Sequence, residues 1–137
     1  MKKGMAAAGL LFCISALAAQ NPIDHALEQC LNGASTTVAM VSCYDRASQA
    51  WDSEMNTQYG QLMKKLTGEP KNKVRGAQRQ WLAYRDSWQS ASAAYFNSTQ
   101  GTLAQISLAA QRVDLVRNQA LLLRSMNKGS CADGGDC

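Results

Sequence analysis

The stretch "VRGAQRQWLAYRDSWQSASAAY", residues 74–95, decides the fold of this chain. Its apolar residues recur at alternating intervals of three and four positions, which is the spacing of one face of an α-helix. The members of this seam are Val74, Ala77, Trp81, Tyr84, Trp88, Ala91 and Tyr95. The pattern predicts one long amphipathic helix whose aromatic rings pack in a helical core.

Further helices are predicted on the N-terminal side of this seam. Asn21 and Pro22 are a typical N-cap and first helical residue, and the short helix that they begin is interrupted at "NGAS", residues 32–35. A second, long helix is predicted over about 36–66. The "TG" that follows ends it, and Pro70 begins the helix that carries the seam.

One more helix is predicted on the C-terminal side. The segment "NSTQG", residues 97–101, separates the seam from a last helix over 102–126, whose broad apolar face includes Val113 and Leu122. No stretch alternates long enough to predict a strand. The chain is therefore predicted to be all-α, an antiparallel bundle of three long helices with a short N-terminal helix.

The first residues have the pattern of an export signal. Lys2 and Lys3 precede an apolar run from Met5 to Leu17, and "ALA" at 16–18 is typical of a cleavage site. We expect the protein to be periplasmic or secreted after this segment is removed. The predicted organisation is a signal peptide over 1–18, a helical domain over 19–126 and a flexible tail containing glycine and cysteine over 127–137.

Removal of the signal segment would leave four of the five cysteines: Cys30, Cys43, Cys131 and Cys137. Four cysteines in an exported protein favour two disulfides, for which three connectivities are possible. We predict the most local pairing, which joins Cys30 to Cys43 and Cys131 to Cys137. Loss of Lys2 and Lys3 also lowers the formal net charge from +4 to +2, too little and too dispersed to indicate nucleic-acid binding.

The sequence lacks the arrangements that catalysis or metal binding would need. His25 is the only histidine, no nucleophile signature is present, and the cysteines do not have C-x-x-C spacing. Asp133 and Asp136 lack the series of oxygen ligands of a calcium loop. We therefore expect a protein that acts by binding, with no cofactor and no metal.

Three motifs together resemble the LprI-type lysozyme-inhibitor family of small exported bacterial proteins. They are the cysteine pair Cys30 and Cys43, then "WDSEMNTQY" at 51–59, then "AQRQWLAYRD" at 77–86. The resemblance covers residues 30 to about 123. The chain departs from it at Gln89 and Gln111, where family members often have a second cysteine pair.

The resemblance implies a helical cell-envelope protein that reversibly blocks the cleft of a lysozyme or related peptidoglycan hydrolase. Two alternatives remain, an immunity protein against a wall-degrading toxin and a structural or chaperone-like envelope factor. The motif residues are predicted to be structural, with Arg85 paired to Asp52. No residues are assigned to the surface that binds the partner. The motif residues are Asp52, Asn56, Tyr59, Gln78, Trp81, Tyr84, Arg85 and Asp86.

Charge adds a separate expectation about docking. Many lysozymes are strongly cationic, so an inhibitor steered by electrostatic attraction needs a local acidic patch, and its inhibition should be sensitive to salt. The candidate carboxylates are Asp24, Glu28, Asp52, Glu54, Asp86 and Asp114.

Overall fold

The computed structural model describes residues 21–129, and within this range it contains helices and no strand. The helices are α1 (Pro22–Asn32), α2 (Thr37–Lys65), α3 (Gly68–Thr99), the short 3-10 helix η1 (Gly101–Leu103) and α4 (Ala104–Lys128). The predicted all-α fold, with three long helices after a short one, is confirmed. The predicted signal peptide lies outside the described residues, as do Cys131 and Cys137.

The helix ends follow from local capping chemistry. Asn21 Oδ1 accepts a hydrogen bond from the backbone N–H of Ile23 at 2.9 Å, and Thr36 Oγ1 accepts one from Ala39 at 3.1 Å. Gly68 and Gly101 stand at the α2–α3 and α3–α4 turns with φ of 59° and 55°, a region that disfavours other residues. The break predicted at 97–101 is shorter than expected, because α3 continues to Thr99.

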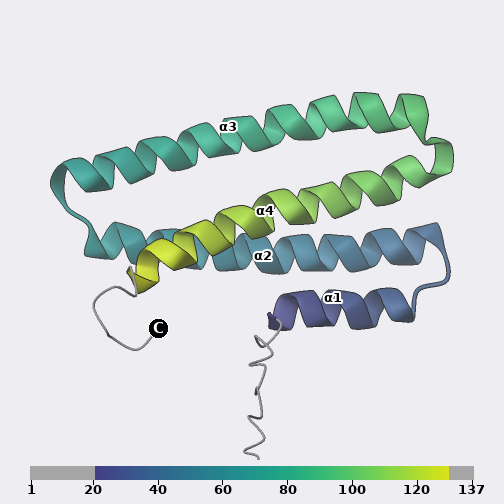
Figure 1. Cartoon of the computed structure of the whole chain (residues 1–137), viewed down its shortest axis with the longest axis horizontal. Helices are drawn as coiled ribbons and strands as arrows, with labels where there is room; N and C mark the ends of the chain where they lie inside the picture. Colours follow the sequence, from purple (N-terminus) through teal and green to yellow (C-terminus); the bar gives the residue numbers. More distant parts are fainter. Residues whose placement is uncertain (1–20, 130–137) are drawn as a thin grey trace, which may run out of the picture.

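The helices lie in a flat array in which α4 runs between α3 and α2, and α1 lies on the far side of α2 (Figure 1). The core is formed mainly where α2 and α4 pack together. Trp51 and Ala120 are completely buried there, and Met55 and Leu123 are almost so. By contrast, α3 packs on α4 and approaches α2 only sparsely.

Trp51 of α2 is the centre of this core. Its indole Nε1 donates a hydrogen bond to Asp24 Oδ1 of α1 at 3.2 Å. The guanidinium groups of Arg117 and Arg124, both on α4, lie over its ring at 5.5 and 5.9 Å from the centroid. Asp24 also accepts a bidentate pair of hydrogen bonds from Arg117 at 2.8–2.9 Å. One buried ring and its polar partners thus connect α1, α2 and α4.

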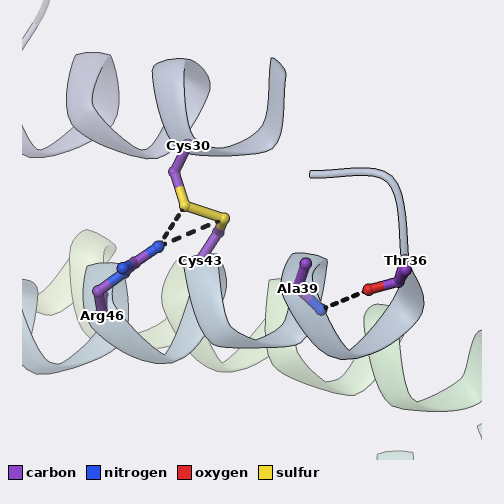
Figure 2. Close-up of a disulfide and its surroundings, with 5 residues drawn as sticks. All are labelled: Cys30, Thr36, Ala39, Cys43 and Arg46. Atoms are coloured by element: carbon purple, nitrogen blue, oxygen red, sulfur yellow. Dashed lines mark hydrogen bonds between the residues drawn. A yellow bond between two sulfur atoms is a disulfide. The ribbon is translucent and has the colours of Figure 1, made fainter. Parts of the chain in front are cut away.

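A disulfide between Cys30 and Cys43 joins α1 to α2, as predicted, with the two Cα atoms 5.7 Å apart. Figure 2 shows this bond crossing the gap between the two helices, with Arg46 of α2 beside it. Arg46 Nη2 donates to Cys30 Sγ at 2.6 Å. The bond fixes the short α1 helix on α2. Over residues 21–129, no helix combines the length and the apolar character that a membrane crossing requires.

Candidate functional site

The outer face of α3 is where the structure corrects the sequence interpretation. Three aromatic residues of the predicted core seam are exposed: Tyr84 by 52 %, Trp88 by 48 % and Tyr95 by 62 %. Ala77 and Ala91 of the same seam are exposed too. The helix is rotated so that most of the seam points away from α2 and α4, and only Val74 and Trp81 remain half-buried against the core.

The inner face of α3 is polar instead. Its two buried residues are Gln78 and Ser92, and Arg85 and Gln89 on the same side are half-buried. Burial of a polar side chain is tolerated when its hydrogen-bonding groups are satisfied. Gln78 Oε1 accepts from Gln119 Nε2 of α4 at 2.8 Å, and Gln78 Nε2 lies 3.6 Å from the sulfur of Met55.

The exposed residues Tyr84, Trp88 and Tyr95 form what we call the aromatic face. Tyr84 and Trp88 meet edge to face, with ring centroids 6.3 Å apart, and Tyr95 contacts Phe96 in the same way at 5.5 Å. Side chains of this type combine large apolar area with a polar group and are enriched at protein interfaces. Large exposed apolar side chains gathered on one surface indicate an interaction site.

A polar groove lies between α2, α3 and α4, with a volume of about 740 Å³. Three motif residues line it: Asp52, Asn56 and Arg85. Asn56 Nδ2 donates to Asp52 Oδ2 at 3.1 Å, whereas the nearest approach of Arg85 to Asp52 is 4.0 Å. The other lining residues are Ser48, Gln49, Ser53, Thr57, Gln89, Arg112 and Val116.

Arg85 is positioned by its own helix more than by α2. Its Nε and Nη2 donate to Asp86 at 2.9 and 2.8 Å, and its guanidinium lies over the Trp81 ring, 5.5 Å from the centroid. The predicted pairing with Asp52 is therefore a loose contact across the groove. The 77–86 motif is divided between two surfaces, because Gln78 and Arg85 face inward while Tyr84 and Asp86 are exposed.

The remaining motif residue, Tyr59, is half-buried and packs against the core, as a structural residue would. Sequence analysis overlooked the polar stripe on α2 that lines the groove. Ser48, Asp52 and Asn56 are spaced four positions apart, with Gln49, Ser53 and Thr57 each following by one. A polar stripe of this kind in a long helix of a small bundle indicates a helix face that is not packed in the apolar core, and it could have been found in the sequence.

Arginines at close distance neutralise three of the six candidate carboxylates. Asp24 is paired with Arg117, and Asp86 with Arg85. Glu54 accepts from Arg124 of α4 at 2.6 Å, and this hydrogen bond holds the pKa of the Glu54 carboxyl below its usual value. The hydrogen bonds that Arg117 donates to the Asp24 carboxylate raise the pKa of Arg117. The acidic side chains serve mainly to connect helices.

No group of three or more histidine, cysteine or acidic side chains within residues 21–129 is arranged to hold a metal ion. His25 is exposed on α1, on the far side of α2 from α3 (Figure 1). The groove offers hydrogen-bond donors and acceptors but pairs no nucleophile with a histidine.

Fold and surface together define a small, disulfide-linked helical protein with an exposed aromatic face. Residues 30–123 match the family model described as "Lysozyme inhibitor LprI". This match covers most of the chain, and the chain belongs to that family. Both the family and the disulfide are consistent with an extracytoplasmic protein.

The fold is shared with a solved structure, that of an uncharacterized protein from Burkholderia thailandensis. The two are 34 % identical, with a TM-score of 0.72, over 79 % of this chain and 54 % of the other. The present chain thus spans about half the length of that protein. No curated protein matches it significantly.

Proposed function

We propose that the protein binds and inhibits a lysozyme or a related peptidoglycan hydrolase through the aromatic face of α3. The observation that carries the proposal is the exposure of Tyr84, Trp88 and Tyr95, each about half accessible to solvent on one helix. Family membership supplies the class of target. Together they favour a binding protein without catalytic activity of its own.

The shape of the face suits an elongated cleft. Tyr84 and Tyr95 are eleven residues apart, which corresponds to about 16 Å along a helix. A straight ridge of this length presents aromatic side chains of the type that dominate interface energetics when they enter pockets on a partner. Inhibition would follow from occupation of the substrate cleft, and it would be reversible because no covalent chemistry is involved.

The surface charge favours binding that depends on direct contacts, with little contribution from long-range electrostatic attraction. Asp86, the carboxylate nearest the aromatic face in the sequence, is held by Arg85, and three of the six candidate carboxylates have close arginine partners. Long-range attraction to a cationic enzyme is therefore weak. We revise the expected salt-sensitive inhibition to inhibition that changes little with ionic strength.

The location follows from the same reasoning. A peptidoglycan hydrolase acts outside the cytoplasm, where a disulfide such as Cys30–Cys43 also persists. We therefore place the working protein in the periplasm or outside the cell, after removal of residues 1–18.

The test is a cell-wall lysis assay with several lysozyme classes, at low and at physiological salt. Wild-type protein should inhibit at least one class at both salt concentrations. A double variant, Tyr84→Ser with Trp88→Ser, should lose inhibition while keeping its helical spectrum. Leu103→Ser is the matched control, because Leu103 is a 61 % exposed apolar residue outside the aromatic face.

Failure has distinct forms. If wild-type protein inhibits no lysozyme class but neutralises a wall-degrading toxin, the immunity alternative replaces the proposal. If the double variant inhibits as well as the wild type, the aromatic face is not the binding surface.

A further inference from the structure

The end of the bundle where α2 and α4 finish and α3 begins carries an unusual concentration of positive charge. Figure 1 shows these three helix ends gathered at one end of the molecule. Lys65 Nζ of α2 donates to the backbone oxygen of Asn127 in α4 at 3.0 Å, which fixes the two ends together. The basic end consists of Lys64, Lys65, Lys71, Lys73, Arg75, Arg79 and Lys128.

Within residues 21–129, few carboxylates stand near this charge to neutralise it. Glu69 is the one acidic residue within 64–79 and 125–129. None of the seven cations forms a salt bridge with a carboxylate of residues 21–129, whereas Arg85, Arg112, Arg117 and Arg124 each have such a partner. The described part of the molecule is therefore electrically polarised along its length.

Exposed apolar side chains accompany the basic residues. Leu122 and Met126, on the last two turns of α4, are 54 % and 45 % exposed. Leu122 was predicted to belong to the apolar core face of its helix, and the structure places it outside. Basic residues around exposed apolar side chains are typical of surfaces that touch a membrane interface.

We infer that the basic end is a docking site for an anionic phospholipid surface. A membrane is the favoured partner of the basic end because of charge complementarity and shape. The cations lie on the last turns of α2 and α4 and on the first four turns of α3, around one end of the bundle that can meet a flat surface, whereas a linear polyanion is usually followed by a stripe or groove. Leu122 and Met126 can enter the headgroup layer, a contact that a soluble polymer does not offer.

Such docking would leave the aromatic face of α3 free. Tyr84, Trp88 and Tyr95 lie beyond the first four turns of α3, and they project sideways from its axis. The inference stands independently of the proposed inhibition, because it rests on different residues.

The experiment measures binding to lipid vesicles by co-sedimentation. Protein expressed from its full sequence and purified as the cell processes it is mixed with vesicles containing phosphatidylglycerol, or with pure phosphatidylcholine vesicles. Binding is expected to the anionic vesicles alone, and it should weaken as salt is raised.

Two variants with the same change in net charge distinguish the effect of the basic end on vesicle binding from the effect of overall charge. Every substituted residue is exposed. The first variant combines Lys73→Gln, Arg75→Gln and Arg79→Gln. The second combines Gln29→Glu, Ser42→Glu and Gln105→Glu, which belong to the end of α1 and the beginnings of α2 and α4. These helix termini lie at the opposite end of the bundle (Figure 1).

The first variant should lower the partition coefficient by about fivefold per basic residue removed, or roughly a hundredfold in all. The second should lower it far less, because its new charges lie away from the membrane. Equal losses in the two variants, or no binding by wild-type protein, would overturn the inference. Binding to soluble polyphosphate without binding to anionic vesicles would also overturn it.

Discussion

The α2–α4 interface buries mainly apolar side chains, whereas the most buried side chains of α3 are polar. Between α2 and α4, Trp51, Met55 and Ala120 are almost fully buried, and polar partners stand around them. On α3, the two most buried side chains are Gln78 and Ser92, and three of its aromatic residues, Tyr84, Trp88 and Tyr95, face solvent. The α2–α4 interface is closed to solvent, while the contact between α3 and α4 includes polar side chains and lies beside an open groove.

This difference divides the molecule into a region that stabilises the fold, the α2–α4 core, and a region that is free for recognition, the aromatic face of α3. Apolar burial near α2 and α4 supplies most of the driving force for folding. Because α3 is attached through contacts such as Gln78 with Gln119, the three residues of its aromatic face need not serve the core. They remain available to a partner.

The strongest test of this comparison replaces one tryptophan in each region. Trp51→Ala should lower the free energy of unfolding by about 3–5 kcal/mol, because it leaves a cavity at a fully buried position. Trp88→Ala, at a half-exposed position, should cost less than about 1 kcal/mol. Urea denaturation measures both. Equal costs would show that α3 contributes to the core as much as α2 does.

A second test concerns the attachment of α1 to α2. Replacing Cys30 and Cys43 by alanine removes a cross-link between residues 13 positions apart. The free energy of unfolding should fall by about 3 kcal/mol in the chain-entropy model. Inhibition by the variant, assayed well below its melting temperature, should persist because α3 is untouched. Loss of inhibition in a folded variant would shift the site toward α1.

The polar attachment of α3 can be tested at Gln78. Gln78→Ala removes the hydrogen bond to Gln119 and should cost about 1–2 kcal/mol. Hydrogen exchange should then accelerate in α3 more than in α2, since the lost contacts with Gln119 and Met55 attach α3, while α2 keeps its core packing against α4. Uniform acceleration in both helices would contradict the division into two regions.

The smallest expected effect is on the acid dependence of stability. Because Arg124 lowers the pKa of Glu54 in the folded protein, the ionised pair stabilises the fold above the ordinary carboxyl value of 4.5. This contribution is lost as the pH falls through the lower, folded-state pKa. Glu54→Gln should therefore flatten the decline in melting temperature below pH 4.5.

Asp52→Asn is the matched control, because the Asp52 carboxylate lies 4.0 Å from Arg85 across an open groove. The control should retain the wild-type acid dependence. A change in Asp52→Asn as large as that in Glu54→Gln would show that the α2–α3 contact is tighter than the geometry indicates.

Local features of the sequence determined the helices and the disulfide. Asn21 and Thr36 are capping residues whose effect depends on the next few positions, so their helix starts could be predicted. Cys30–Cys43 belongs to the most local of the three possible connectivities, and these two cysteines are bonded. The family, too, was recognisable from motifs whose spacing is fixed along the chain.

Only the tertiary structure decided which face of α3 turns inward. Spacings of three and four residues define a stripe, but a neighbouring stripe through Gln78, Arg85, Gln89 and Ser92 has a similar spacing and is rotated by about 100° for a shift of one residue. The choice depended on partners from other helices: Gln119 and Met55 satisfy Gln78, and the core of α2 and α4 is already filled by Trp51. Those partners are distant in sequence, so no periodicity within α3 could reveal that its aromatic face points outward.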